Sequence, residues 1–388
     1  MTNLPQGWEV KTIEEVCKNS SSNLALKDIK DKNGDYPVFG ASGIVSYVDF
    51  YHKDKECLAI VKDGSIGKVF LLPSKSSVIG TLNYLENFEN TNLKYLFYFL
   101  HNIDFSKYIL GSAIPHIYFR DYKKEQIPLP PLKEQERIVG ILDFAFSKID
   151  ENIKKAKENL ANIDELMQSA LQKAFNPLND DTKENYQLPQ SWEWKSLGEI
   201  GNTSSGGTPL RNKKEYWENG SIKWLKSGEL NDGYIDFIEE NITEEAIENS
   251  SAKIFQKGTL LIAMYGATAG RLGILNLDSA TNQAVCAFLH KDNKNIKFLE
   301  KFLFYFLFFI RDKIIKDSFG GAQPNISQTY IKNLQIPLPP LQEQEQIAKH
   351  LDFVFEKAKA LKELYTKELK DYEELKQSLL DKAFKGEL

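Results

Sequence analysis

The feature that most constrains this chain is an internal duplication. The phrase IPLPPLKEQERI at 127–138 returns as IPLPPLQEQEQI at 336–347, with ten of twelve positions identical and an offset of 209 residues. Two further motifs return in the same order, LPQGWEV (4–10) as LPQSWEW (188–194) and KYLFYFL (94–100) as KFLFYFL (301–307). Agreement in both order and spacing predicts that one structural unit occurs twice in the chain.

The composition is that of an ordinary globular protein. The 388 residues are 42% hydrophobic and 27% charged, and the length favours two or three domains. Three scattered cysteines indicate a reducing compartment rather than a disulfide framework. The N-terminus lacks the pattern of a signal peptide, and the longest apolar run, 302–310, is too short to span a bilayer. We therefore expect a cytoplasmic protein without membrane contact.

Positive and negative charges are balanced along the chain. The net charge is −5; residues 1–126 carry 15 basic and 15 acidic side chains, and residues 188–335 carry 17 and 17. A protein that binds nucleic acid tightly by itself usually has a strongly basic surface. If this chain contacts DNA, we expect weak binding alone and a partner that supplies positive surface.

A long helix is expected after each copy of the repeated phrase. After Pro131, apolar residues recur in alternating steps of three and four, the spacing of a heptad seam. The 43 residues from Lys133 to Phe175 would form a rod of roughly 65 Å at ~1.5 Å per residue. The second seam is less regular, because Lys362 and Lys376 occupy positions where apolar residues are expected.

We predict that the two helices pair with each other through their apolar seams. Simple core packing within a helical hairpin is the alternative, and it would bury the same two stripes. The residues expected in the pairing are Val139, Leu142, Phe146, Ile149, Ile153, Leu160, Ile163, Met167, Leu351, Phe355, Tyr365, Leu369, Tyr372 and Leu379.

The stretches between the repeated motifs are β-rich. Residues 36–51, 57–72 and 259–275 contain β-branched and aromatic runs broken by glycine turns. A short aromatic helix stands ahead of each repeated phrase. These patterns predict an α+β fold of two globular domains, each followed by a long α-helix. The duplication itself predicts pseudo-twofold symmetry.

The repeated phrase has two interpretations. Pro128 and Pro131 have the Pro-x-x-Pro spacing of a proline-rich ligand. Proline also ends an extended chain and is tolerated at the start of a helix, where its missing N–H costs little. We favour the second interpretation, a stiff joint between domain and helix, with Leu132 and Ile138 packing against the domain.

No catalytic or metal-binding pattern stands out in the sequence. The five histidines lack metal-ligand spacing with cysteines or acids. GSIGK at 64–68 resembles part of a phosphate-binding loop but is two residues too short, so a hairpin turn is the better interpretation. There is no Gly-x-Ser-x-Gly elbow. We predict that the chain is not an enzyme and binds no metal or cofactor itself.

Polar and basic side chains near the glycine turns are candidates for contact with phosphates or base edges of DNA. For each of them the alternative is a solvated surface residue or a turn former. The candidates in the first half are Lys62, Ser65, Lys68, His116, Tyr118, Arg120, Lys123 and Lys124. Those in the second half are Arg211, Lys213, Lys214, Tyr265, Arg271, Gln323, Asn325, Gln328 and Tyr330.

A set of motifs extends over essentially the whole chain: LPQGW at 4–8 with its repeat, SGGTP at 205–209, Tyr216-Trp217, IKWLKSG at 222–228, GGAQ at 320–323 and the two IPLPPLxEQ blocks. With these motifs in doubled order, the chain resembles the specificity subunits of type I restriction–modification systems. One departure is Ile114, where the Gly-x-x-Gln pattern that Gln323 completes would have glutamine.

The resemblance implies a division of labour along the chain. Target recognition domains would occupy 1–132 and 188–341, each reading one half of a split double-stranded DNA site. A central helix with a linker at 133–187 and a C-terminal helix at 342–388 would pack as an antiparallel coiled coil. Since the halves have diverged and differ by 25 residues, the two half-sites should differ in sequence, which makes the whole site asymmetric.

The resemblance also implies partners and cofactors. Two modification subunits would dock on the helices, and restriction subunits would join them. S-adenosylmethionine would bind the modification subunits, and ATP with Mg would bind the restriction subunits, while this chain would bind neither.

Two other functions stay open at the level of sequence. One is the specificity partner of a system in which a single polypeptide combines cleavage and methylation. The other is a protein-binding adaptor that uses its helices as a scaffold and never contacts DNA.

Overall fold

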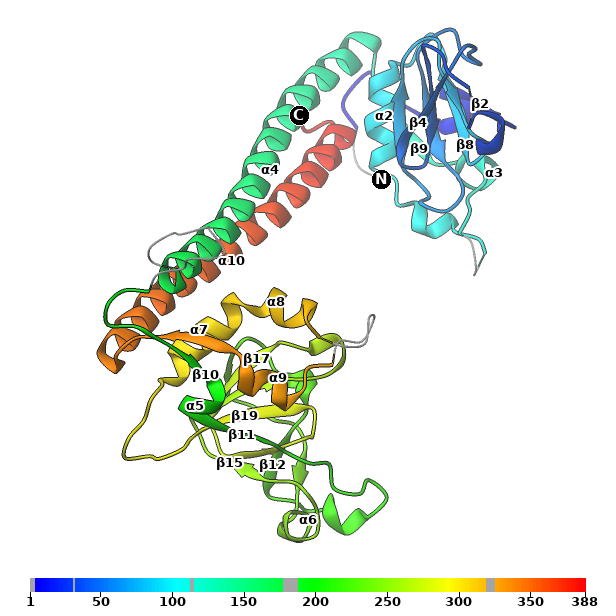
Figure 1. The fold of residues 1–388 in the computed structure, drawn as a ribbon. Helices are drawn as coiled ribbons and strands as arrows, with labels where there is room; N and C mark the ends of the chain where they lie inside the picture. The colour runs from blue at the N-terminus through cyan, green and yellow to red at the C-terminus, as the bar shows by residue number, and fades with distance from the viewer. Residues whose placement is uncertain (1–3, 31, 112–114, 177–187, 319–324) are drawn as a thin grey trace. The chain divides into compact units, whose positions relative to one another are not determined.

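The chain consists of two compact units. The computed structural model describes residues 4–30, 32–111, 115–176, 188–318 and 325–388. Unit 1 comprises Met1–Glu158 with Tyr365–Leu388, and unit 2 comprises Asn159–Leu364. Each unit contains one β-rich region together with part of each of two long helices (Figure 1). Among the described residues, no helix is both long and apolar enough to cross a membrane.

Unit 1 is built on a four-stranded antiparallel sheet. Its strand order is β2–β8–β5–β6, formed by Cys17–Ser21, Leu82–Asn87, Cys57–Val61 and Val69–Leu72. Strand β5, CLAIV, is buried at every position, as its continuous apolar sequence requires for a central strand. A smaller sheet, β4–β3–β7, is formed by Gly43–Val48, Tyr36–Gly40 and Ser77–Val78. The short helices are α1 (Ile13–Val16), α2 (Leu93–His101) and α3 (Phe119–Tyr122).

Unit 2 repeats this main sheet strand for strand and extends it. The order is β11–β19–β16–β17–β13, formed by Gly201–Ser205, Val285–His290, Leu260–Ala263, Leu272–Leu275 and Gly233–Ile235. The second sheet, β14–β12–β18–β15, is formed by Asn241–Ile242, Ile222–Leu225, Ser279–Thr281 and Ile254–Phe255. The helices are α5 (Leu197–Ile200), α6 (Glu244–Glu248), α7 (Glu300–Phe309), α8 (Arg311–Lys316) and α9 (Gln328–Asn333). Among the residues of unit 1 that the structure describes, no strand of the main sheet corresponds to β13.

The repeated proline phrase begins in a strand and ends in a helix. In unit 1, β9 (Gln126–Leu129) pairs antiparallel with β1 (Glu9–Thr12), and α4 begins at Leu132. In unit 2, β20 (Gln335–Leu338) pairs with β10 (Glu193–Ser196), and α10 begins at Leu341. The phrase is thus already engaged in a backbone ladder, which agrees with the joint and not with a free proline-rich ligand.

A buried glutamine fixes this joint in unit 1. Gln135 is fully buried, and its Oε1 accepts a hydrogen bond from the N–H of Asn92, the residue that precedes α2 (2.7 Å). Its Nε2 donates to the carbonyls of Pro130 (2.8 Å) and Asn90 (3.1 Å). One side chain therefore ties the first turn of α4 to the proline segment and to the start of α2.

The second copy of the phrase repeats the arrangement in unit 2. Gln344 is 1% exposed; its Oε1 accepts from the N–H of Leu299 (2.9 Å), and its Nε2 donates to the carbonyls of Pro339 (2.9 Å) and Lys297 (3.0 Å). Ile138 is buried as predicted, but Leu132 is 43% exposed. The expected packing of Leu132 on the domain is therefore wrong, because glutamine rather than leucine holds this turn.

The long helices are α4 (Leu132–Phe175) and α10 (Leu341–Lys385). Helix α4 starts one residue earlier than predicted. In unit 1, Asp150 pairs with Lys376 and the Arg137 guanidinium donates to the Leu388 carbonyl (2.7 Å), so the helices run antiparallel there. In unit 2, Asp164 pairs with Lys362. The two lysines that interrupt the predicted apolar seam are thus the residues that form ion pairs between the helices.

None of the fourteen residues predicted for the helix pairing is exposed to solvent. Val139, Leu142, Ile149, Ile163 and Leu351 are buried. The other nine are half-buried. Within unit 1, Leu380 and Phe384 of α10 join Leu142 of α4 and helix α2 in one hydrophobic core. Within unit 2, Phe175 of α4 joins Leu351 of α10 and helix α7 in another. Each helix pair is therefore part of the core of its unit.

Candidate nucleic-acid interface

The glycine-rich loop of unit 1 lies beside a second loop that precedes α3. Residues 62–68 join β5 to β6, which pair antiparallel, so GSIGK forms a hairpin turn as predicted. Gly64 and Gly67 have φ of +81° and +76°, a left-handed conformation that other residues adopt only with strain. The Gly64 N–H donates to the Pro115 carbonyl and the Ile117 N–H donates to the Lys62 carbonyl, both at 2.9 Å.

This pairing brings together candidates that are 50 residues apart in sequence. An isolated β-bridge joins Asp63 to His116, next to Lys62 and Ser65. The rings of His116 and Tyr118 lie 4.9 Å apart, and the Arg120 guanidinium lies 4.5 Å from the Tyr118 ring centre. Tyr118 is 42% exposed. We name residues 62–68 and 115–120, the second range reaching into the start of α3, the unit 1 edge. It holds Lys62, Ser65, Lys68, His116, Tyr118 and Arg120.

Lys123 and Lys124 are engaged elsewhere in unit 1. Both ammonium groups bind the carboxylate of Glu14, with Lys123 at 2.7 Å. Hydrogen bonds from Lys123 first and Lys124 second hold the pKa of Glu14 below its usual range. The carboxylate offsets much of the positive charge that these two lysines would offer to a phosphate.

Unit 2 contains the same construction with different side chains. A β-bridge joins Tyr265 to Asn325, and the Ile326 N–H donates to the Met264 carbonyl (2.8 Å), as Ile117 does to Lys62. The loop from Tyr265 to Arg271 connects β16 to β17 and has positive φ at Gly266 and Gly270. Arg271 is exposed, and Tyr265 is 39% exposed.

The described residues 264–271 and 325–328 form the unit 2 edge. Gln328 lies at the first position of α9, and its Nε2 donates to the Ser205 hydroxyl at the end of β11. Tyr265, Arg271, Asn325 and Gln328 are the predicted residues that this edge contains. Gln323 and Ile114 lie outside the described residues, so the predicted role of Gln323 stays a prediction.

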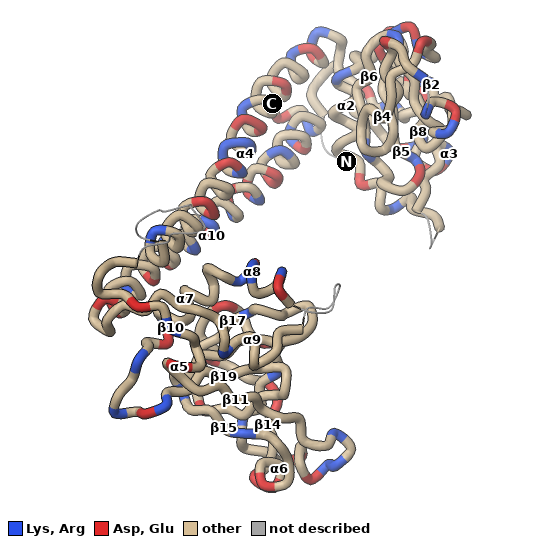
Figure 2. Tube along the Cα trace, in the orientation of Figure 1, with Lys and Arg blue, Asp and Glu red and all other residues tan. Residues whose placement is uncertain are grey.

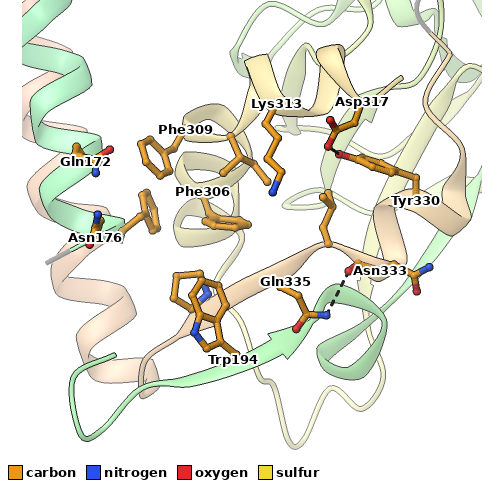
Figure 3. A pocket seen from close by; sticks show the side chains of 14 residues that line it. Gln172, Asn176, Trp194, Phe306, Phe309, Lys313, Asp317, Tyr330, Asn333 and Gln335 are labelled. Atoms are coloured by element: carbon orange, nitrogen blue, oxygen red, sulfur yellow. Dashed lines mark hydrogen bonds between the residues drawn. The ribbon is translucent and has the colours of Figure 1, made fainter. Parts of the chain in front are cut away.

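Tyr330 lies on a pocket rather than in the loop pair. A cavity of about 510 Å³ in unit 2 is lined by aromatic side chains that include Phe306, Phe309 and Trp194 (Figure 3). The Tyr330 hydroxyl donates to Asp317 Oδ2 (3.0 Å) in this cavity. Burial, together with the bond to Asp317, raises the pKa of Tyr330 to about 12, so the hydroxyl stays protonated at neutral pH.

Arg211, Lys213 and Lys214 belong to another loop of unit 2. The Arg211 guanidinium stacks 3.8 Å from the Trp217 ring centre and binds Glu240 (2.6 Å). Lys213 donates to the Tyr216 hydroxyl (3.0 Å), and Lys214 lies 3.7 Å from Glu218. Burial raises the pKa of Glu240, but hydrogen bonds from Lys226 and Arg211 outweigh it and leave that pKa lowered. These contacts orient the Arg211 side chain, which is still 52% exposed.

Charges of both signs are interspersed along the described chain. Basic and acidic residues alternate along α4 and α10 (Figure 2). Within the described part of the chain, no group of three or more His, Cys, Asp or Glu side chains is placed to hold a metal ion. The described residues of the two edges carry hydrogen-bonding and aromatic groups with scattered cations, the kinds of side chain that contact base edges and phosphates.

Sequence reasoning missed several residues that shape these sites. Asp63 is the bridge partner of His116, and Glu14 forms ion pairs with two candidate lysines. Gln135 and Gln344 hold the joints. The glutamines carried a signal, since both stand at the same position of the repeated phrase. Asp63 and Glu14 carried none, because their partners come from distant segments.

The sequence matches the type I restriction modification DNA specificity domain twice, at residues 5–162 and 189–370. The chain belongs to the type I specificity-subunit family. Its relatives include the EcoR124I/EcoR124II specificity subunit of Escherichia coli, 26% identical over 370 residues, which covers 90% of this chain and 87% of that protein. The MjaVIII specificity subunit of Methanocaldococcus jannaschii is 27% identical over 415 residues, covering 99% and 94%.

Solved structures of this family share the fold. A chain from work on complex assembly and conformational transition of the type I R-M system matches with a TM-score of 0.76 and 22% identity over the full length of both chains. The HsdS subunit from Thermoanaerobacter tengcongensis matches with a TM-score of 0.57 and 22% identity, covering 99% and 98%. The predicted α+β class, with a long helix after each β-rich domain, is confirmed.

Membership in this family fixes the broad function. The family is one of DNA specificity subunits, whose part in restriction–modification is sequence recognition rather than methylation or cleavage. The prediction of a specificity subunit, not an enzyme, is therefore confirmed by the family.

Proposed function

We propose that this chain reads an asymmetric, bipartite DNA site, one half with each unit, and serves as the assembly core of a restriction–modification complex. In this proposal two modification subunits dock on the long helices and restriction subunits join them. S-adenosylmethionine binds the modification subunits, and ATP with Mg binds the restriction subunits. The chain itself contributes the choice of DNA sequence.

One observation supports the bipartite reading most strongly. The same backbone bridge occurs in both units, between Asp63 and His116 in one and between Tyr265 and Asn325 in the other. The side chains on this bridge differ between the two units. A shared frame with different hydrogen-bonding groups is what two related readers of different half-sites require, since base identity is read by side-chain donors and acceptors in the grooves.

The first experiment maps adenine methylation across the genome of a host with and without this gene. Loss of one split, asymmetric motif is the expected result. An unchanged pattern would instead favour a protein-binding adaptor. Subunits that co-purify with the chain separate the remaining alternative, because a combined system supplies cleavage and methylation on one polypeptide.

The second experiment assigns each half-site to an edge. Ser65→Ala with His116→Ala should relax one half of the methylated motif, and Tyr265→Ala with Asn325→Ala should relax the other. A good bidentate base contact contributes about 1–3 kcal/mol of discrimination, roughly 5- to 150-fold.

Lys294→Ala is the control, because Lys294 is an exposed cation of unit 2 that lies outside its edge and is not among the predicted DNA contacts. It should leave both half-sites unchanged. If either double variant altered both half-sites, or if the control altered one of them, the assignment of one half-site to each edge would be wrong.

A further inference from the structure

A five-residue motif recurs near the start of both long helices. It is Leu-Asp-Phe-Ala-Phe at 142–146 in unit 1 and Leu-Asp-Phe-Val-Phe at 351–355 in unit 2. Four of the five positions are identical. The contacts within each unit account for three of these four.

The leucine and the aspartate hold the helix to its domain. Leu142 and Leu351 are completely buried in the cores of their units. Asp143 accepts hydrogen bonds from the Lys94 ammonium (2.7 Å) and the Tyr98 hydroxyl (2.6 Å). In unit 2, Asp352 likewise accepts hydrogen bonds from the Lys301 ammonium (2.7 Å) and the Tyr305 hydroxyl (2.6 Å).

The second phenylalanine of the motif is also accounted for. Phe146 packs edge-on against Tyr98 with ring centres 5.3 Å apart. Phe355 packs edge-on against Tyr305 at 5.0 Å. The same aromatic pair therefore recurs in both units and faces inward.

The first phenylalanine has the opposite environment. Phe144 is 70% exposed and Phe353 is 60% exposed, which leaves most of each ring in water. The Lys357 ammonium lies 5.6 Å from the ring centre of Phe353, and Lys148 is the corresponding residue in unit 1. A polar residue at this helix position would avoid exposing an aromatic ring. Packing within the described units thus does not explain why both copies keep it.

Duplication indicates what kind of partner would use these rings. The loops of the two edges differ in side chains, whereas the exposed Phe with a Lys four residues later is the same in both units. Surfaces that meet different DNA sequences can diverge, but surfaces that meet two copies of one protein are held alike. Exposed aromatic residues flanked by charge are typical anchors of protein interfaces.

We propose that Phe144 and Phe353 are the anchors through which two copies of the modification subunit dock, one on each unit. Each ring enters an apolar pocket of the partner, and the adjacent lysine meets an acidic rim. This inference rests on the proposed function and assigns the contact to two named side chains.

Native mass spectrometry of the full chain, co-expressed with the modification subunit of the same system, tests the proposal. The unaltered chain should carry two copies, Phe144→Lys or Phe353→Lys one copy, and the double variant none. Each single change should weaken its contact about 30-fold or more, as truncation of an interface hot spot does. Lysine is a good helix former, so these exposed substitutions should preserve the fold, which circular dichroism checks.

Leu364→Lys is the control. Leu364 is 63% exposed on α10, but the matching position of α4 is Lys155, so it belongs to no repeated apolar pair. It should leave two copies bound. Two copies on the folded double variant, or loss of copies from the control, would overturn the proposal. Failure of the unaltered chain to bind any modification subunit would instead count against the proposed function.

Discussion

Replacing Gln135 by leucine should loosen the joint of unit 1 selectively. The side chain is fully buried and makes three hydrogen bonds, at 2.7, 2.8 and 3.1 Å, all to backbone groups. Leucine has a similar size but offers neither donor nor acceptor. The Asn92 N–H and the carbonyls of Asn90 and Pro130 would therefore lose their side-chain partner.

The expected cost follows from those three bonds. At about 1 kcal/mol of net stabilisation each, their loss amounts to about 3 kcal/mol. If opening of this joint limits exchange, amide hydrogens at the start of α2 should exchange roughly 100-fold faster.

Hydrogen exchange followed by mass spectrometry on a peptide covering 90–101 measures this change. The corresponding peptide of unit 2, 297–309, should keep its rate in the Gln135→Leu protein. Gln344→Leu should have the reverse pattern, because its Oε1 binds the Leu299 N–H (2.9 Å). Gln342→Leu, an exposed position of α10, is the control for the substitution itself.

The reasoning would be refuted by either of two results. One is a rate within about threefold of the unaltered protein, which corresponds to less than ~0.7 kcal/mol. The other is equal acceleration in both peptides, since each glutamine bonds only to backbone groups of its own unit among the described residues.

Three further outcomes are expected. Lys376→Glu should lower the free energy of unfolding, measured by urea denaturation, by about 1 kcal/mol, because an exposed pair contributes at most about 1 kcal/mol. Adding Asp150→Lys should restore it, and a double variant no more stable than the single one would contradict the pairing. Burial raises the pKa of Asp143, but its hydrogen bonds with Lys94 and Tyr98 outweigh burial and leave the folded-state pKa lowered. The ionised Asp143 therefore stabilises the fold above about pH 4, and this stabilisation is lost as the pH falls through the folded-state pKa. Asp143→Asn should accordingly lose less stability than the unaltered protein when both are titrated with acid. The thiols of Cys17, Cys57 and Cys286 are buried, and burial raises the pKa of each to about 12. A thiol reagent at pH 8 should therefore label none of them in the native chain and all three in urea.

The local spacing of apolar, glycine and proline residues predicted where several helices and strands of this fold lie. The three- and four-residue spacing of apolar side chains located α4 within one residue of its start, and β-rich runs with glycine turns located the hairpin of β5 and β6. Proline in the repeated phrase marked the change from strand to helix. These features are set by neighbours within a few residues, so the sequence alone carries them.

The candidate interface was predictable only in part. Glycine turns indicated the loops at 62–68 and 264–271, but nothing in the sequence indicated that His116 and Asn325 lie beside them. The sequence also carried no sign that Arg211 contacts Glu240 and Trp217, so its predicted contact with DNA stays a prediction. Whether a cation is exposed to a ligand depends on residues that the fold brings near it.

By itself, the sequence determined that this protein is built from one unit used twice, with a stiff joint and a long helix in each copy. Tertiary structure decided what the joint is made of and why the second seam contains lysines. Gln135 and Gln344 act only because a distant helix start lies against them, and Lys376 is tolerated in the seam because Asp150 lies opposite. Periodicity reports which face of a helix is buried, whereas the partner of each buried polar group is fixed only when long-range contacts form.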